Sequence, residues 1–592
     1  MNTNEKIDHI RQLMKDGNIA AVVIPSDDPH QSEYVAEYWQ ARKWLTGFSG
    51  SAGTAVVTRE HAILWADFRY YIQAEKQISD SRFELYKMGE PDVPTFQKWL
   101  INTLKPGDII GMDGNVVSRA NVKKYKAGFE AKGLLLNTDI DFIKELWKDR
   151  PVRPNSKAFS LSEKYAGKGR KDKIEEIRRQ MDALGASYHL MATLDDIAWT
   201  LNLRGKDVHT NPVNIAFVLV TSKMVSLFVS YGKVDNELAK ELKRDGIEIA
   251  EYEDITTVLS QIQDSKVILV DPENTNYRLY QSINKKSKIV EKPNPAIALK
   301  TIKNDIEITH LRQTLIKDGA AVVNFLFWIE HQNEDAQITE QSVADKLYAF
   351  RKDQELFVGN SFDPIMAYRD HSAMCHYSAT KETDVVIGNT GMFLTDSGGN
   401  YLTGTTDITR TICRGEPSKQ EITDYTLVLK GHICVATILF PKGTKGFQID
   451  TLSRQYLWNE GLDFGHGTGH GVGFFLCVHE GPARISPHPI DVKLEKGMVL
   501  TNEPGLYREG AYGIRLENMI LVDQAFENEF GIFMKFETLT NCHFERNLID
   551  INLLSKDEKD WINTYHDRVY EKLSPNLDKD VASWLKEKTS PL

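Results

Sequence analysis

The strongest constraint on the fold is a helix–strand pattern that occurs twice in the first half of the chain. It opens with apolar positions at helical spacing, among them Ile7, Ile10 and Met14, followed by the buried strand AAVVIP and further strands and helices. After the proline-rich stretch RPVRPN, the segment KIEEIRRQMDALGASYHLMATL repeats the order of helix and then strand. Such alternation is typical of α/β domains. We therefore expect two divergent copies of one α/β unit.

Proline-bearing breaks and a change of pattern divide the chain into three expected domains. The break RPVRPN lies in a predicted linker from Asp149 to Tyr165 and ends the first copy, and EKPNPAIALKTIKND ends the second. From about Lys303, long amphipathic helices come first and strands follow. The predicted domains are 1–155, 156–302 and 303–592, the last with a C-terminal helical extension. A length of 592 residues is compatible with three domains, since single domains average roughly 150 residues.

Two helix starts are predicted by capping boxes. In Ser418-Lys-Gln-Glu421 and in Ser555-Lys-Asp-Glu558, a serine precedes a glutamate by three positions and an apolar run follows. The serine hydroxyl accepts a hydrogen bond from the third backbone amide, and the glutamate carboxylate accepts one from the serine amide. We expect the first helix to run toward Phe440 and the second to open the C-terminal extension.

Charge and cysteine content exclude several classes of protein. The net charge is 72 − 83 = −11, which argues against a nucleic-acid partner and against an anionic membrane surface. The five cysteines include no CxxC pair, so neither a disulfide framework nor a thiolate zinc site is expected. The N-terminus has charges where a signal peptide needs an apolar core, and the apolar stretches are too short to span a bilayer. We expect a cytoplasmic protein with reduced cysteines.

Two aspartates form the first cluster of candidate functional residues. Asp396 and Asp407 lie in strand-like runs, TDSGGNY and TTDITRT, with a Gly/Asn-rich turn between them. In an antiparallel hairpin, two such residues can face each other across the ladder. Two buried carboxylates repel each other and lose their solvation, so such a pair needs a cation. A polar hairpin with two solvated aspartates is the alternative.

Three histidines within a glycine-rich stretch form the second cluster. His466, His470 and His479 fall within FGHGTGHGVGFFLCVHEGP, although the whole chain has only 16 histidines. The flanking glycines argue against a helical metal-binding pair and favour close approach of the backbone to a ligand. A dinucleotide loop is a weak alternative, because the expected order of strand, loop and ribose-binding acid is missing. Imidazole serves both as a metal ligand and as an acid or base, which favours a functional loop over three structural histidines.

Two glutamates form the third cluster. Glu503 interrupts an apolar strand before Pro504, and Glu517 lies in a strand-like run where Arg515 and Met519 share its face. A buried glutamate needs a partner, either Arg515 or a metal, and an exposed Arg515–Glu517 pair is the alternative. Together the clusters offer four carboxylates and one imidazole with no thiolate, which suits Mn²⁺, Mg²⁺ or Co²⁺. Two ions balance that charge better than one.

The order TDSGGNY…TTDITRT…GHGTGHGVG…HEGP…TNEPGLY…YGIRLEN resembles the pita-bread metallopeptidases, and among them the long, three-domain aminopeptidase P type. The stretches GFSGSAGTAVV, DFRYYIQA, DDIAWTLNLRG and LLSKDEKDWINTYH extend the resemblance over nearly the whole chain. It implies an α/β (α+β) protein whose C-terminal pita-bread metallopeptidase domain follows two creatinase-N-like α/β domains.

The resemblance also implies a set of metal ligands around two divalent ions, most often Mn²⁺ in this family. Asp407 and Glu517 would bridge the two ions. Asp396 would complete the coordination of one ion, and His470 with Glu503 that of the other.

Four further positions match residues that the family uses without binding metal. His376, His466 and His479 match histidines that contact the substrate and assist catalysis. Arg69 matches an arginine that reaches from the first domain toward the substrate. Glu503, besides its role as a ligand, is the candidate carrier of a proton to the leaving nitrogen, directly or through a histidine.

The implied activity is hydrolysis of the N-terminal Xaa-Pro bond of peptides by a hydroxide bridged between the two ions, in a cytoplasmic enzyme that the family suggests is a homodimer. The Xaa-Pro bond has no N–H and proline fixes φ, so it requires a dedicated site. Prolidase, which cuts Xaa-Pro dipeptides and lacks the middle segment, is the alternative enzyme. A non-catalytic pita-bread peptide-binding protein is the third reading, although such proteins have typically lost ligand residues.

Overall fold

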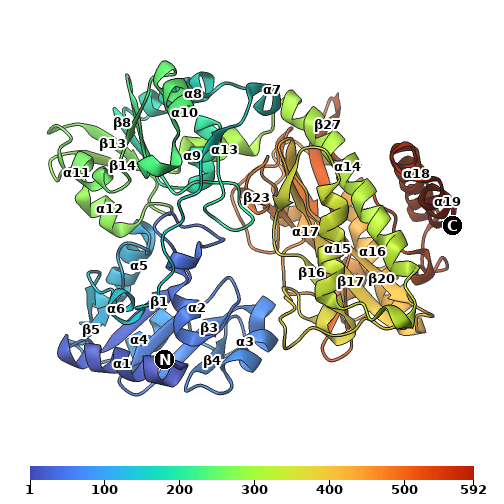
Figure 1. Ribbon diagram of the computed structural model, residues 1–592, viewed down its shortest axis with the longest axis horizontal. Helices are drawn as coiled ribbons and strands as arrows, with labels where there is room; N and C mark the ends of the chain where they lie inside the picture. The colour runs from blue at the N-terminus through green and yellow to red at the C-terminus, as the bar shows by residue number, and fades with distance from the viewer. The chain divides into compact units, whose positions relative to one another are not determined.

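The computed structural model describes residues 1–592, apart from the side chain of Glu334. The chain forms two compact units (Figure 1). The first unit comprises Met1–Leu161 and Lys168–Ile297, and the second comprises Ser162–Gly167 and Ala298–Leu592. The first unit contains two separate six-stranded sheets. The three domain boundaries at 1–155, 156–302 and 303–592 stay predictions.

The two sheets of the first unit have the same strand order, β4-β3-β2-β1-β5-β6 in one and β12-β11-β10-β8-β13-β14 in the other. In each sheet the three central strands are antiparallel, and the outer strands run parallel to their inner neighbours. The two copies expected from the sequence are therefore confirmed in strand order and in the sense of every pairing. The strands are β1 (Ala21–Pro25), β2 (Thr54–Thr58), β3 (Ala62–Ala66), β4 (Glu84–Lys87), β5 (Ile109–Gly111), β6 (Leu135–Asn137), β8 (Tyr188–Met191), β10 (Phe217–Thr221), β11 (Val225–Phe228), β12 (Ile247–Ala250), β13 (Val267–Val270) and β14 (Lys288–Glu291).

Helices cover both faces of the first sheet. Because side chains alternate along a strand, Val22 and Ile24 pack with α1 on one face, while Ala21 and Val23 pack with α4 and α5 on the other. On one face of the second sheet, α11 and α12 contribute to the core. The helices of this unit are α1 (Thr3–Asp16), α2 (Ala41–Thr46), α3 (Tyr71–Ile78), α4 (Phe96–Thr103), α5 (Arg119–Glu130), α6 (Phe142–Leu146), α8 (Arg170–Ala183), α9 (Leu194–Leu201), α10 (Asn236–Arg244), α11 (Asp254–Ser260) and α12 (Tyr277–Ser282).

The second unit is built from several small sheets and long helices. Its sheets have the orders β15-β18-β19, β16-β17-β20, β21-β28-β27-β24-β22-β23 and β25-β26. The strands are β15 (Phe357–Asn360), β16 (Ile365–Tyr368), β17 (Gly391–Ser397), β18 (Gly399–Tyr401), β19 (Gly404–Thr405), β20 (Ile408–Arg414), β21 (Phe440–Pro441), β22 (Gly469–Gly471), β23 (Glu480–Ile485), β24 (Val499–Asn502), β25 (Gly505–Arg508), β26 (Tyr512–Arg515), β27 (Asn518–Asn528) and β28 (Gly531–Thr538).

Figure 1 shows α14, α15 and α16 alongside β16, β17 and β20, and one apolar core joins these elements with the C-terminal helices α18 and α19. Both predicted capping boxes are present, from Ser418 at α16 and from Ser555 at α18. The helices of this unit are α7 (Glu163–Ala166), α14 (Asp305–Glu330), α15 (Glu340–Lys352), α16 (Lys419–Thr437), α17 (Gly446–Trp458), α18 (Lys556–Leu573) and α19 (Lys579–Lys588). The helix α13 (Pro295–Thr301) begins in the first unit and ends in the second.

Two local predictions are wrong. The stretch after RPVRPN is not a plain linker: it forms β7 (Phe159–Ser160), which pairs with β9 (Leu203–Arg204), and then α7. The run YGIRLENMILV is not one strand, because the chain leaves the two-stranded sheet after β26 and enters the six-stranded sheet at β27. Between the two strands, the Glu517 amide donates to the Thr409 carbonyl at 3.1 Å. The break turns Glu517 toward β20.

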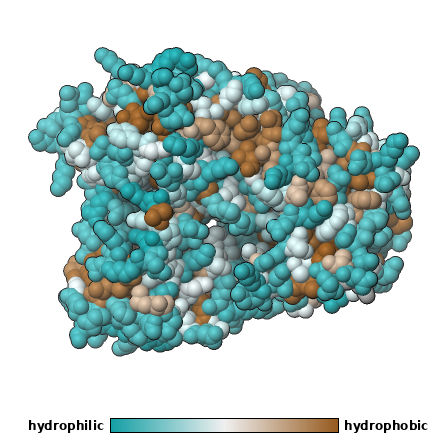
Figure 2. Space-filling model, in the orientation of Figure 1, coloured by the Kyte–Doolittle hydropathy of each residue, from teal (hydrophilic) through white to brown (hydrophobic). Residues whose placement is uncertain are grey.

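The surface is largely hydrophilic, with apolar side chains in small scattered groups on the face that Figure 2 shows. All five cysteines are free, as expected from their spacing. None of the described helices combines the length and apolarity that crossing a membrane requires.

Candidate metal centre

Asp396 lies in the sheet β16-β17-β20, and Asp407 lies next to it. Asp396, in β17, lies opposite Thr409 of β20, and Asp407 immediately precedes β20. The two carboxylates therefore lie diagonally across the ladder, not directly opposite as the hairpin pattern allows. Asp396 is 8% exposed and Asp407 3%, which excludes the solvated hairpin.

His470, Glu503 and Glu517 approach Asp407 from three other segments. One ligand atom each from Asp407, His470 and Glu517 lies within 4.8 Å of the others. His470 Nε2 is 3.4 Å from Asp407 Oδ2 and 3.5 Å from Glu503 Oε1. His470 lies in β22, Glu503 directly follows β24, and Glu517 lies between β26 and β27. The structure thus brings together four of the five ligands that the sequence predicts.

Asp396 joins this group through Arg515. The Arg515 guanidinium donates from Nη2 to Asp396 Oδ2 at 2.5 Å and from Nη1 to the Tyr507 hydroxyl at 2.7 Å. Arg515 is buried and pairs with Asp396, so the exposed Arg515–Glu517 pair is excluded. The other oxygen, Asp396 Oδ1, is buried and has no hydrogen-bond partner.

The electrostatics of the group show an excess of buried negative charge. Burial, together with the charges of Asp407 and Glu503, raises the pKa of Glu517 well above its usual range. Burial likewise raises the pKa of Glu503, against the opposing charge of His470. For His470, burial alone would lower the pKa, but the hydrogen bond to Asp407 and the charge of Glu503 outweigh it and raise the pKa to about 9.

This donor set fits divalent cations. The four carboxylates and one imidazole offer hard ligand atoms, and Asp396 Oδ1 is left without a partner in the protein. Carboxylates in this environment stay ionised only with added positive charge nearby. A pair of divalent ions supplies that charge, so the residues present fit a dinuclear centre.

The glycines around His470 are required by the packing of their own strand. A side chain at Gly469 would place its Cβ 1.9 Å from the Thr501 carbonyl oxygen, and one at Gly471 would place it 2.2 Å from the Glu480 carbonyl oxygen. The glycines therefore let β22 pack closely against neighbouring backbone. Close approach of this backbone to a ligand stays a prediction.

The predicted non-ligand histidines are half-buried. The ring of His479 lies 4.3 Å from that of His470, edge-on at 82°. His466 Nε2 is 2.7 Å from the Tyr507 hydroxyl. His376 lies in the segment after the short helix Arg369–Ala373. Their roles toward a substrate stay predictions.

Arg69 belongs to the first unit, where its guanidinium pairs with Asp67 at 2.8 Å. Its approach to a substrate also stays a prediction.

Sequence reasoning missed Tyr507, which lies between His466 and Arg515. Its signal was present, because Tyr507 ends the quoted run TNEPGLY. It also missed Thr409, whose hydroxyl donates to Glu517 Oε2 at 2.9 Å and so orients that carboxylate.

Family models match four consecutive stretches of the chain. Residues 6–142 and 149–307 each match the creatinase/prolidase N-terminal domain. Residues 309–524 match metallopeptidase family M24, and residues 532–592 match the C-terminal region of peptidase M24. The fold is therefore a pita-bread domain preceded by two creatinase-like domains, as expected.

Individual relatives match over the full length. A probable Xaa-Pro aminopeptidase P of Pyrenophora teres f. teres is 39% identical, over 100% of this chain and 93% of the relative. The crystal structure of X-prolyl aminopeptidase from Caenorhabditis elegans, described as a cytosolic enzyme with a di-nuclear active site, is 34% identical with a TM-score of 0.96 and covers 100% of both chains. An Xaa-Pro dipeptidase from Bacillus anthracis, 25% identical with a TM-score of 0.51, covers 99% of its own chain but only 64% of this one. The chain belongs to metallopeptidase family M24, among the long Xaa-Pro aminopeptidases.

Proposed function

We propose that this protein is a metal-dependent aminopeptidase that hydrolyses the N-terminal Xaa-Pro bond of peptides. One observation carries the proposal: Asp407, His470 and Glu517 converge within 4.8 Å in a buried, negatively charged group. The full-length similarity to Xaa-Pro aminopeptidases supports the reaction and the substrate class. Prolidase is the weaker alternative, because the dipeptidase match leaves over a third of this chain uncovered.

The ligand set is also a proposal. Asp407 and Glu517 would bridge two ions, Asp396 would bind one of them, and His470 and Glu503 the other. Divalent ions held there supply Lewis acidity and make water a nucleophile at neutral pH. The proposed ion is Mn²⁺, whose preference for oxygen and imidazole ligands the site meets.

Glu503 would move a proton. Its Oε1 accepts a hydrogen bond from the Thr501 hydroxyl at 3.2 Å and lies 3.5 Å from His470 Nε2. The proline nitrogen must be protonated to leave, and Glu503 would deliver that proton.

The histidines would bind and orient the peptide. His376 and His479 would donate hydrogen bonds to the carbonyl oxygen as negative charge develops on it. His466, held by Tyr507, would contact the peptide beside the scissile bond. Arg69 would contact the peptide from the first unit.

Three finer properties accompany the proposal. The protein would act in the cytoplasm, form a homodimer and take peptides longer than two residues. Multi-angle light scattering tests the dimer directly: a mass near twice 67.3 kDa is expected, and a mass near 67.3 kDa would contradict it.

The experiment that tests the function compares four peptides with the Mn²⁺-loaded protein: X-Pro-Y, X-Ala-Y, acetyl-X-Pro-Y and the dipeptide X-Pro. We expect release of X from the first alone. A site shaped for the proline ring leaves the extra alanine N–H without a partner, which costs about 1–3 kcal/mol. Comparable cleavage of X-Ala-Y would indicate a general aminopeptidase. Cleavage of the dipeptide without the tripeptide would indicate prolidase.

A further inference from the structure

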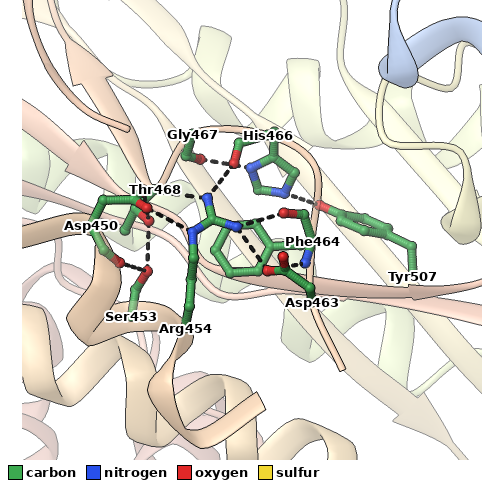
Figure 3. A network of polar contacts seen from close by, with 9 residues as sticks. All are labelled: Asp450, Ser453, Arg454, Asp463, Phe464, His466, Gly467, Thr468 and Tyr507. Carbon is green, nitrogen blue, oxygen red and sulfur yellow. Dashed lines mark hydrogen bonds and ion pairs between the residues drawn. The ribbon is translucent and has the colours of Figure 1, made fainter. Parts of the chain in front are cut away.

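A buried arginine from α17 holds the loop that carries His466 (Figure 3). Arg454 is 3% exposed, and its Nη2 donates to the His466 carbonyl oxygen at 2.7 Å. Its Nη1 donates to the Phe464 carbonyl oxygen at 2.5 Å and to Asp463 Oδ1 at 3.0 Å. One guanidinium therefore binds three acceptors within four consecutive residues of the loop.

A buried carboxylate holds both the arginine and the end of the same loop. Asp450, 2% exposed, accepts from Arg454 Nε at 2.7 Å and from the Thr468 hydroxyl at 2.7 Å. The Thr468 carbonyl oxygen in turn accepts a hydrogen bond from the backbone amide of Glu503 at 2.7 Å. Hydrogen bonds on both sides of His466 thus connect the loop to one turn of α17. The end of the loop at Thr468 is also hydrogen-bonded to Glu503, a proposed metal ligand.

The loop has no regular secondary structure to hold it in place. Residues 464–468 form neither helix nor strand, and glycines at 465 and 467 flank His466. Glycine leaves the backbone more conformations than any other residue. The His466 ring is nevertheless directed at Tyr507, with Nε2 2.7 Å from the hydroxyl (Figure 3). The contacts of Arg454 and Asp450, together with the Ser453 hydroxyl 2.6 Å from the Thr468 hydroxyl, restrict this loop from the α17 side.

We propose that Arg454, with Asp450, is a positioning residue for the reaction: it fixes the backbone of the glycine-rich loop so that His466 faces the peptide and Tyr507. The inference rests on the proposed function, because His466 is placed at the peptide there. Arg454 touches neither a ligand atom of the proposed centre nor the peptide, and it acts through His466.

An arginine is required because of the shape of its charged group. The planar fork donates in several fixed directions at once, to two carbonyl oxygens and two carboxylates here. Its central carbon also lies over the Phe464 ring, 3.9 Å from the ring centroid. A lysine keeps the charge but presents one compact ammonium, which cannot span both carbonyls. Arg454→Lys therefore keeps the positive charge but loses the paired contacts that hold the loop.

The test is a cycle of wild type, Arg454→Lys, His466→Ala and the double variant, all Mn²⁺-loaded and assayed on X-Pro-Y. We expect Arg454→Lys to lower kcat roughly 10- to 100-fold, the size typical of small misplacements near a reaction centre. Bound metal should stay at the wild-type level. In the His466→Ala background, Arg454→Lys should lower kcat no further, because the residue it positions is already gone.

A matched control is Arg170→Lys in the first unit. Arg170 is also buried and donates to a backbone carbonyl and to a carboxylate, Asp245, but it lies outside the catalytic unit. Its kcat should equal that of wild type. If Arg454→Lys fails to fold, Thr468→Val takes its place in the cycle, because it removes the hydroxyl that connects the loop to Asp450 and Ser453 of α17.

A second readout does not depend on activity. Hydrogen–deuterium exchange of the peptide spanning 460–472 should be faster in Arg454→Lys than in wild type, and unchanged in Arg170→Lys. The positioning role would be overturned if Arg454→Lys lowered kcat by the same factor in the wild-type and His466→Ala backgrounds. It would also be overturned if Arg454→Lys changed neither kcat nor the rate of exchange. A wild-type protein that does not cut X-Pro-Y would refute the proposed function, while the exchange comparison would still decide whether Arg454 holds the loop.

Discussion

At the scale of single residues, the candidate centre is a concentration of buried negative charge. The side chains of Asp407 and Glu517 are almost fully buried, and Asp396 Oδ1 has no partner. The nearby cations are His470 and Arg515, and Arg515 is already paired with Asp396. Bound divalent ions account for this imbalance, so the loss of one central carboxylate should change both metal content and chemistry.

The Asp407→Ala variant should abolish hydrolysis of X-Pro-Y and retain one ion or none. Asp407 is the proposed bridge, and without it two cations would face each other with too little compensating charge. Inductively coupled plasma mass spectrometry of the dialysed protein measures the ions. Two retained ions with full activity would disprove the dinuclear assignment.

The His466→Ala and His479→Ala variants should lose turnover but keep their metal. A positioned proton donor or acceptor contributes about 10²- to 10⁴-fold to the rate, and neither histidine is a proposed ligand. Metal analysis and kcat on the same preparations separate the two effects. Loss of an ion in either variant would show that the ligand set is wrong.

At the scale of elements, the centre depends on strands that several buried ion pairs hold together. Lys303, just after α13, pairs with Glu480 at the start of β23, and both side chains are almost fully buried. Lys300 Nζ lies 3.9 Å from the other oxygen of the same carboxylate. Because β23 pairs with β22, this contact fixes the strand beside His470 to the beginning of the second unit.

The Lys303→Met variant should be less stable by at most about 3–5 kcal/mol, the cost of leaving a buried charge without a partner, because Lys300 stays 3.9 Å from the Glu480 carboxylate. Adding Glu480→Gln removes that charge and should recover most of the loss. Chemical denaturation followed by tryptophan fluorescence measures both. If the double variant is no more stable than Lys303→Met, the ion pair is not the cause.

The core beneath β27 contains histidines that must stay neutral. Burial, reinforced by the charge of Arg410, lowers the pKa of His432 to about 3, and burial with Arg410 does the same for His566. A histidine whose pKa is lowered on folding contributes its full stability above its unfolded pKa of about 6.5 and loses it as pH falls toward 3.

The stability difference between wild type and His432→Gln should therefore depend on pH. Glutamine takes up no proton as the pH falls. The free energy of unfolding of the variant should therefore rise, relative to that of wild type, by about 1.4 kcal/mol for each pH unit from 6 down to 4. Denaturation midpoints at pH 7.5, 6, 5 and 4 give the slope. A difference that does not change with pH would show that His432 takes up its proton without unfolding.

The elements were more predictable than their contacts. The helix starts at Ser418 and Ser555 depend on four consecutive residues and are confirmed, and the repeated helix–strand pattern correctly predicts two equivalent sheets. The break between Arg515 and Asn518 could not be predicted, because it results from the pairing of β25 with β26 and of β24 with β27. Strand periodicity contains no information about a change of sheet.

At the scale of the whole molecule, the two units could be predicted from different kinds of sequence information. The duplicated first unit follows from local patterns of apolar residues. The candidate centre in the second unit joins segments more than 100 residues apart, such as Asp407 and Glu517. Residue chemistry alone predicted that these side chains suit divalent cations, two better than one, but not that they lie together. Their grouping came from the order of motifs that the family shares. The Arg454 network was not predicted, since a buried arginine has no sequence pattern of its own.

The most direct test of the account is a titration of the metal-free protein with Mn²⁺, measuring release of X from X-Pro-Y at each step. The account predicts no activity without metal and a plateau at two equivalents per chain, because the proposed ligands surround two ions that act together. A plateau at one equivalent, or hydrolysis by the metal-free protein, would contradict a dinuclear Xaa-Pro aminopeptidase.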